Sequence, residues 1–269
     1  MNATEEALMS YERFVVVGDS CAEGLDDPYP DGSRYRGWAD LVAARLAADN
    51  PDLRYANLAV RGRRLDQIIS EQFPAATTFR PDLVALFGGG NDVLTGGFDP
   101  DAVAGRVAEA VAKLTAVAPT VLVFTLSDLS QRMRMTRGLQ PRIAALNSAI
   151  HSAAATHGAL VVDLADDPSV RDLRYFGPDR LHLSEHGHRR LAGHLLRRLD
   201  VPFDRGWLEP LPGEPARPGM LGHARWVWRE VRPVAVSRVR NRLVGRSPGD
   251  GFQPKRPELR PLAAAELES

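Results

Sequence analysis

The sequence predicts an α/β fold, a three-layer α/β/α sandwich built on a five-stranded parallel sheet. Short apolar runs rich in Val, Leu and Phe alternate along the chain with segments of helical periodicity. The runs are continuously apolar, as is typical of parallel strands buried on both faces. Strands that alternate with helices in this way pair in parallel through right-handed crossovers.

The order of elements follows from these runs and from local start and stop signals. The expected strands are residues 13–18, 53–60, 82–89, 119–126 and 159–165. The expected helices are residues 37–49, 64–73, 99–117, 141–158 and 184–200. Asp99 followed by Pro100 begins one helix, and Ser184 caps another. Pro74 is expected to end the helix over 64–73.

The composition is that of a globular protein with one main domain and an extension. Of the 269 residues, 44% are hydrophobic and 25% are charged, so a sizeable core forms without disulfides. We expect the main domain over residues 1–204 and the extension over residues 205–269. The formal net charge is zero, which argues against nucleic acid as a partner.

The chain predicts a cytoplasmic location without integral membrane association. The N-terminal segment carries Glu5 and Glu6 and has no basic region, unlike a signal peptide. No window approaches the roughly 18 apolar residues of a membrane span. Cys21 is the only cysteine, so no intrachain disulfide is expected.

The extension differs in charge from the rest of the chain. From Arg205 onward it has 12 basic and 7 acidic residues, whereas the preceding residues have an acidic excess. This balance, together with Trp226 and Trp228, favours an arm that packs on the main domain and is partly disordered at its end. The alternative is a basic amphipathic helix over 234–244 that makes weak contact with a membrane surface or binds a partner.

Reactive residue types follow the predicted strands at one rim of the sheet. In a parallel α/β sheet, ligands bind outside the carboxyl ends of the strands. Ser20 follows the first strand, Gly62 the second and Asn91 the third. Asp179 and His182 come after the fifth strand, beyond a loop. Together they supply the groups that acyl transfer requires.

Each of these residues has an expected role. Ser20 is the nucleophile once His182 accepts its proton, and Asp179 fixes the tautomer of the imidazole. The backbone N–H groups of Ser20 and Gly62 and the side-chain amide of Asn91 are expected to form an oxyanion hole. Losing one such donor typically costs about 2.7–4 kcal/mol of transition-state stabilisation.

Four short motifs carry a resemblance to a known family. They are GDS at 18–20, VRG at 60–62, GGND at 89–92 and DRLH at 179–182. With these motifs in this order, the sequence resembles the SGNH hydrolases, also called the GDSL esterase/lipase family. The segment GDGFQPKRPELRPL looks like that of a cytosolic actinobacterial branch.

The resemblance implies a flavodoxin-like fold and a Ser-His-Asp triad that hydrolyses a small-molecule acyl ester or thioester without a cofactor or metal. The chain departs from the family pattern at Cys21 and Ala22, where many members have a hydrophobic residue and then Thr or Ser. An acyltransferase with the same residues and a catalytically idle binding module are the alternative functions. The acyl chain length, the leaving group and the oligomeric state stay open.

Simpler interpretations of the motif residues also exist. Ser20 is interpreted as a nucleophile rather than a helix cap, because His182 and Asn91 are both present. Cys21 is interpreted as a packing residue rather than as the nucleophile. The GGGND segment 88–92 lacks the Lys-Ser/Thr of a phosphate-binding loop.

A zinc site is the metal alternative, because segment 182–194 holds four histidines. His182 and His186 have the spacing of two ligands on one helix face. Ser184, however, is expected to begin the helix, which places His182 outside it. The HExxH pattern is also missing from the sequence.

The remaining polar residues near the motifs are given structural roles. Asp19 and Asp92 are expected to brace their loops, and Asn57 either bonds across the rim or is solvated. Residues 129–139 are expected to form a loop over one edge of the site. The nearby arginines are interpreted as solvated, with recognition of an anionic acyl donor as the alternative: Arg61, Arg63, Arg64, Arg132 and Arg134.

Overall fold

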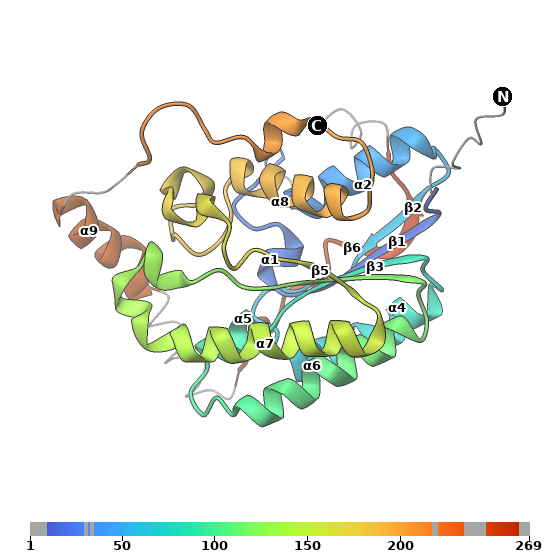
Figure 1. Ribbon diagram of the computed structural model, residues 1–269, viewed down its shortest axis with the longest axis horizontal. Helices are drawn as coiled ribbons and strands as arrows, with labels where there is room; N and C mark the ends of the chain where they lie inside the picture. The colour runs from blue at the N-terminus through green and yellow to red at the C-terminus, as the bar shows by residue number, and fades with distance from the viewer. Residues whose placement is uncertain (1–9, 30–31, 33–34, 217–219, 234–245, 264–269) are drawn as a thin grey trace.

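The computed structural model describes residues 10–29, 32, 35–216, 220–233 and 246–263. Within these residues, one sheet has the strand order β5-β4-β3-β1-β2-β6. The strands are β1 (Arg13–Gly18), β2 (Arg54–Asn57), β3 (Leu83–Phe87), β4 (Thr120–Phe124), β5 (Leu160–Val162) and β6 (Arg256–Pro261). The first five are parallel, which confirms the predicted α/β/α sandwich (Figure 1).

Helices cover both faces of the sheet (Figure 1). One face carries α2 (Gly37–Asp49) and α8 (Glu185–Arg198). The other carries α3 (Leu65–Glu71), α4 (Phe73–Thr78), α6 (Pro100–Thr115) and α7 (Gln140–His157). Two short helices, α1 (Ser20–Glu23) and α5 (Gly90–Leu94), start just beyond β1 and β3. Shorter helical segments are the 3-10 turns Leu129–Gln131, Arg134–Leu139, Pro168–Arg171, Leu173–Tyr175 and Arg205–Leu208, then α9 (Met220–Trp226) and the π-helical turn Val227–Val231.

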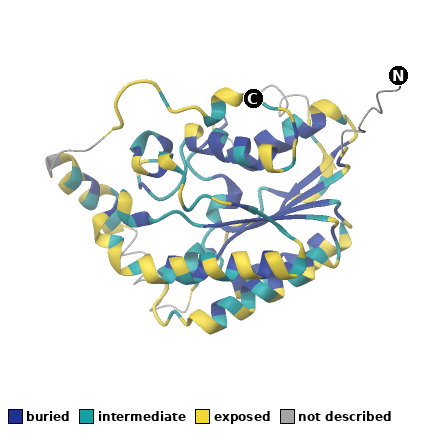
Figure 2. Ribbon diagram, in the orientation of Figure 1, coloured by how far each residue is buried: buried dark blue, intermediate teal, exposed yellow. Residues whose placement is uncertain are grey.

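The core lies in two layers, one on each side of the sheet. Along β1, Val15 and Val17 pack into the layer beneath α6 and α7, whereas Phe14 and Val16 pack into the layer beneath α2 and α8. Figure 2 shows the central strands buried throughout. Fully burying such a side chain contributes roughly 1.5–3 kcal/mol, so both helix layers are held to the sheet mainly by apolar contact.

Most predicted helix ends agree with the structure, and one does not. The Asp99 side chain accepts hydrogen bonds from Asp101 N and Ala102 N, and Ser184 caps α8. Pro74 does not end a helix but stands in the first turn of α4, where a missing N–H costs no hydrogen bond. The expected loop over 129–139 contains two 3-10 helices.

The extension adds a strand that the sequence analysis did not predict. Strand β6 pairs antiparallel with β2 at the edge of the sheet. Its two prolines are tolerated there because one side of an edge strand needs no N–H donors. Trp226 is buried as expected, but Trp228 is 65% exposed. The expected helix over 234–244 lies outside the described residues.

The lengths and polarity of the helices bear on the prediction that the chain has no integral membrane association. Among the described residues, every helix is too short or too polar to span a bilayer.

Candidate active site

The structure brings Ser20, His182 and Asp179 together at the carboxyl end of the sheet. Ser20 Oγ lies 2.8 Å from His182 Nε2, although the two residues are 162 positions apart. His182 Nδ1 lies 2.6 Å from Asp179 Oδ2. Ser20 is the first residue of α1, and His182 precedes the Ser184 cap of α8. The three side chains form one continuous hydrogen-bonded chain.

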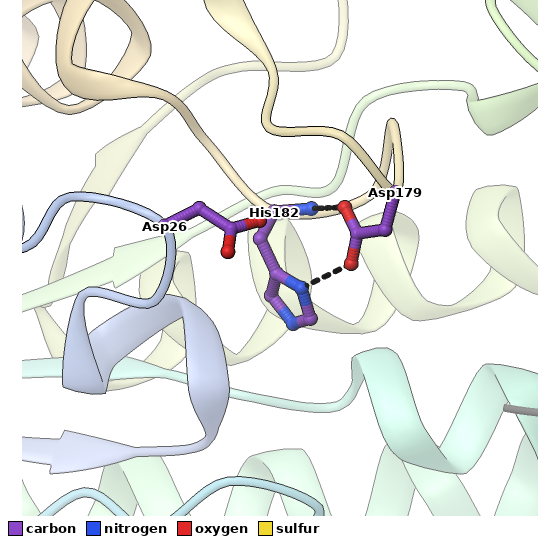
Figure 3. Close-up of side chains that lie close together, drawn as sticks. All are labelled: Asp26, Asp179 and His182. Carbon is purple, nitrogen blue, oxygen red and sulfur yellow. Dashed lines mark hydrogen bonds and ion pairs between the residues drawn. The ribbon is translucent and has the colours of Figure 1, made fainter. Parts of the chain in front are cut away.

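The loop that carries Asp179 and His182 is held by its own hydrogen bonds. Asp179 Oδ1 accepts from Leu181 N at 2.8 Å and from His182 N at 3.0 Å. Gly177 N donates to the His182 carbonyl at 2.9 Å. This closed loop leaves the second Asp179 oxygen directed at the imidazole (Figure 3).

The Asp179 carboxylate and the His182 imidazole shift each other's pKa. Burial raises the pKa of Asp179, but the hydrogen bond and charge of His182 and the backbone N–H groups of Leu181 and His182 together outweigh it, and the net pKa is below the usual 3.8. Burial lowers the pKa of His182, but the Asp179 carboxylate outweighs it, and the net pKa is above 6.5. The imidazole is therefore a stronger base than a free histidine.

A second acidic side chain, Asp26, faces the same pair (Figure 3). Ligand atoms of Asp26, Asp179 and His182 lie within 4.8 Å of one another, the one such group in the described ranges. Both ring nitrogens of His182 are already hydrogen-bonded, to Asp179 and Ser20, so the ring offers no free lone pair to a metal. The arrangement fits acid–base chemistry better than metal binding.

The expected oxyanion donors lie close together but differ in whether they already donate a hydrogen bond. Within the described part of the chain, the backbone N–H groups of Ser20 and Gly62 donate no hydrogen bond. Asn91 Nδ2 is already engaged, at 3.2 Å from Asp19 Oδ2 and 3.1 Å from the Arg63 carbonyl. Through these two contacts, Asn91 joins the residue before Ser20 to the residue after Gly62.

Asp19 braces the nucleophile loop, as expected. Its carboxylate accepts from Cys21 N at 3.1 Å, which caps α1, and from Asn91 Nδ2. The side chain is buried, and burial raises its pKa to about 6. Asp92 likewise braces its surroundings, with Oδ2 3.0 Å from Leu65 N.

Asn57 supports the loop that carries Ser20 through a buried hydrogen bond. It is fully buried, and its Nδ2 donates to the Ala22 carbonyl at 2.9 Å and to Tyr55 Oη at 3.1 Å. The interpretation of Asn57 as a solvated strand end is therefore wrong.

Two supports of this loop escaped the sequence analysis. Gln72 pairs with both backbone groups of Gly18: Oε1 accepts from Gly18 N at 2.8 Å, and Nε2 donates to Gly18 O at 2.8 Å. Arg61 forms an ion pair with Glu23 in α1, and the same carboxylate accepts from Arg61 N at 3.0 Å. Gln72 had no motif to reveal it. Arg61 was interpreted as solvated, which is wrong.

Arg132 also has a buried role rather than a solvated one. Its Nε donates to the Arg180 carbonyl at 2.7 Å, between Asp179 and His182. Its guanidinium lies over the Phe176 ring at 4.0 Å, and burial lowers its pKa to about 10. Arg134, in contrast, is exposed.

Cys21 packs beside Ser20, where burial holds its thiol in the protonated form. Its side chain is partly buried against the α2–α8 layer. Burial, followed by the nearby Asp19 charge, raises the thiol pKa well above its usual value. The thiol thus stays protonated near neutral pH, unlike a nucleophilic cysteine.

A comparison with known families agrees with this geometry. The sequence model of the GDSL-like lipase/acylhydrolase family matches residues 16–190, which include every residue of the site. The chain belongs to this family. As an SGNH hydrolase it is a carboxylic ester hydrolase. None of the curated proteins matches the chain.

Solved structures of hydrolases share the fold. TesA is 25% identical, with a TM-score of 0.58 over 70% of this chain and 98% of its own. An acetylxylan esterase from Geobacillus stearothermophilus is 18% identical, with a TM-score of 0.58 over 75% of this chain and 98% of its own. An alpha/beta hydrolase from the metagenome of Lake Arreo, Spain, is 21% identical, with a TM-score of 0.57 over 74% and 97%. About a quarter of this SGNH hydrolase has no counterpart in these chains.

Proposed function

We propose that this SGNH hydrolase is a serine esterase with Ser20 as nucleophile, His182 as general base and acid, and Asp179 as the partner of the imidazole. The observation that carries the proposal is the chain of contacts from Ser20 Oγ to His182 Nε2 and from His182 Nδ1 to Asp179. Solved forms of the similar acetylxylan esterase include catalytic mutants at a serine, an aspartate and a histidine, the same three residue types.

The reaction proceeds through an acyl-enzyme. Ser20 Oγ attacks the ester carbonyl carbon as its proton moves to His182 Nε2, and Asp179 stabilises the resulting imidazolium. The tetrahedral oxyanion accepts hydrogen bonds from Ser20 N–H, Gly62 N–H and the Asn91 amide. His182 then protonates the leaving alcohol oxygen as the carbon–oxygen bond breaks. Water, deprotonated by His182, attacks the acyl-enzyme, and Ser20 leaves with its proton restored.

Asn91 must change partners to serve as the third donor. Both of its amide hydrogens are used in the free protein, on Asp19 and on the Arg63 carbonyl. A negatively charged oxyanion accepts a stronger hydrogen bond than a neutral carbonyl does, so it displaces the weaker of these contacts. Stabilisation from Asn91 is thereby concentrated in the transition state.

The surroundings support a short acyl group on a polar alcohol. A cavity of about 720 Å³ adjoins Gly62 and Asn91. The other described side chains that line it are mostly polar: Arg64, Gln67, Thr95, Arg246 and Ser247, with Leu94 and Pro248 as the apolar ones. We expect acetyl to butyryl esters to react best, because charged and amide side chains border this cavity beside Gly62 and Asn91.

The test is hydrolysis of p-nitrophenyl esters of graded chain length by the full chain, with acetylated xylose and acyl-CoA added to the panel. Ser20→Ala and His182→Ala are expected to lower kcat by at least about a thousandfold. Cleavage of short esters should exceed that of decanoyl esters. A fluorophosphonate should label the wild-type protein and leave Ser20→Ala unlabelled.

His186→Ala is the matched control, because His186 is exposed on α8 and outside the triad. It should keep wild-type activity. Full activity of Ser20→Ala would refute the assignment of the nucleophile. Transfer of the acyl group to an added alcohol in preference to water would identify an acyltransferase instead.

A further inference from the structure

A turn near the C-terminus packs against the candidate oxyanion hole. Asp250 N donates to the Ser247 carbonyl at 3.1 Å, and Ser247 N donates to Asp250 Oδ2 at 2.9 Å. We call these residues, Ser247–Asp250, the C-terminal turn. It lies outside the segment matched by the family, which ends at residue 190.

Two glycines let the turn reach the backbone of the oxyanion loop. Gly62 has a φ of +78°, and a Cβ there would lie 2.8 Å from both Gly249 N and Pro248 Cβ. A Cβ at Gly249 would lie 2.3 Å from the Arg61 carbonyl oxygen. The peptide groups around Gly62 therefore pack directly on the turn, with no side chain between them.

Hydrogen bonds and an ion pair between side chains also stabilise the contact between the C-terminal turn and the loop around Gly62. Arg63 Nη1 lies 2.8 Å from Asp250 Oδ1, and the Arg63 side chain is only 12% exposed. Gln67 Nε2 donates to Ser247 Oγ at 3.2 Å. Arg63 also accepts from Asn91 Nδ2 through its carbonyl. One residue thus links the C-terminal turn to a second oxyanion donor.

The C-terminal turn is followed by residues that hold it in place, and it also borders a cavity. The Phe252 ring lies 4.4 Å from the Arg61 guanidinium carbon, and the chain then enters β6 of the sheet. Ser247 and Pro248 line the cavity of about 720 Å³ together with Gly62 and Asn91. The turn is accordingly held in place independently of any substrate.

We propose that the C-terminal turn is a positioning element of the active site. It fixes the Gly62 peptide so that this donor meets the oxyanion, and through the Arg63 carbonyl it holds the Asn91 amide close by until the oxyanion displaces that carbonyl. Asp250 and Gly249 are its positioning residues, and neither touches the reacting atoms. The inference rests on the proposed function, since it assigns this turn to the oxyanion hole of that reaction.

The test compares Asp250→Ala with wild type in the full chain, using p-nitrophenyl acetate and counting active sites by fluorophosphonate titration. We expect kcat per active site to fall about tenfold while KM stays within about twofold. Affinity for phenylboronic acid should fall by a similar factor, because its tetrahedral serine adduct occupies the oxyanion hole. The pH midpoint of kcat/KM should stay unchanged, because Asp179 and His182 are not altered.

Two further variants keep the result interpretable. Gly249→Ala forces the backbones apart and should lower kcat at least as much as Asp250→Ala. Glu258→Gln removes an exposed charge from β6 and should behave as wild type.

The possible outcomes separate this inference from the proposed function. A purely structural role would reduce thermal stability and the number of titratable sites but leave kcat per site unchanged. That result, or full kcat in folded Asp250→Ala and Gly249→Ala, overturns the inference and leaves the esterase assignment standing. An active Ser20→Ala protein would overturn the esterase assignment itself.

Discussion

Asn91 Nδ2 lies 3.2 Å from the carboxylate of Asp19, the residue that directly precedes Ser20 in the chain. The same carboxylate caps α1 through Cys21 N, so one buried group orients both the nucleophile helix and a candidate oxyanion donor. Its raised pKa of about 6 shows that this arrangement holds a carboxylate where its charge is poorly solvated.

Replacing Asp19 should lower the catalytic activity and raise the free energy of unfolding. Between about pH 4 and 6 the folded protein keeps a proton on Asp19 that the unfolded chain has lost, so the free energy of unfolding falls as pH rises. A shift of about two pKa units corresponds to at most about 3 kcal/mol. Asp19→Asn should therefore gain stability relative to wild type as pH rises through this window, measured by urea unfolding.

The same variant should lose about tenfold in kcat, because Asn91 loses its charged acceptor. Asp128→Asn is the control of opposite sign. Burial raises the Asp128 pKa, but the hydrogen bonds from Gln140 and Ser130 and the Arg132 charge together outweigh it, and the net pKa is lowered. Removing that carboxylate should cost stability near neutral pH. Equal pH dependence of unfolding in Asp19→Asn and wild type would contradict the prediction.

The pH dependence of turnover should report His182. Its pKa lies above 6.5, and the base must be neutral to accept the Ser20 proton. We expect kcat/KM for p-nitrophenyl acetate to rise with pH through that pKa and then to level off, with a steeper limb below about pH 6, where Asp19 also gains a proton. His188 does not interfere, because burial lowers its pKa to about 4.

Asp179→Asn tests the cause of that shift. Without the carboxylate, burial is left as the main influence on His182, so the midpoint should move below its wild-type position and kcat should fall by orders of magnitude. An unchanged midpoint in Asp179→Asn would show that another group sets the His182 pKa.

Arg132 should act through the loop that carries the catalytic pair. Its hydrogen bond to the Arg180 carbonyl and its contact with Phe176 fix that loop. Arg132→Ala should cost about 2 kcal/mol in unfolding free energy, as for a hydrogen bond to a charged group, and should lower kcat. Arg134→Ala, at an exposed neighbouring position, should change neither. Thermal unfolding and steady-state kinetics of both variants test this prediction.

Cys21 should be dispensable. Because burial raises its thiol pKa, it should react slowly with iodoacetamide at pH 8, and activity should survive the treatment. Cys21→Ala should keep activity within about threefold, since the backbone carbonyl that binds Trp38 Nε1 is retained. Rapid inactivation by the reagent, absent in Cys21→Ala, would instead reveal a reactive thiol near Ser20.

The sequence predicted the five parallel strands because each is a continuous apolar run that ends in small or polar residues. Strand β6 could not be predicted in this way, because RPELRP is proline-rich and charged and depends on its pairing with β2. Pro74 was misplaced for a related reason. A proline can end one helix or stand in the first turn of the next, and the local sequence does not distinguish the two.

Motif residues of the site were predictable because their chemistry requires particular residue types at strand ends. The supports were not, because Gln72, Arg63 and Asp250 act through contacts between distant segments. An arginine that holds a carbonyl or a carboxylate has the same sequence signature as a solvated one. Only the tertiary structure separates Arg132 from Arg134.

The Arg63–Asp250 contact joins residues 187 positions apart. Chains are made from the N-terminus at about 5–20 residues per second, so the Ser20 loop and the histidine loop leave the ribosome well before the C-terminal turn. A nascent chain can thus bring Ser20 and His182 together before the turn beside the candidate oxyanion hole is in place. Ester cleavage should consequently appear late in biosynthesis, once the last strand has docked on the sheet edge.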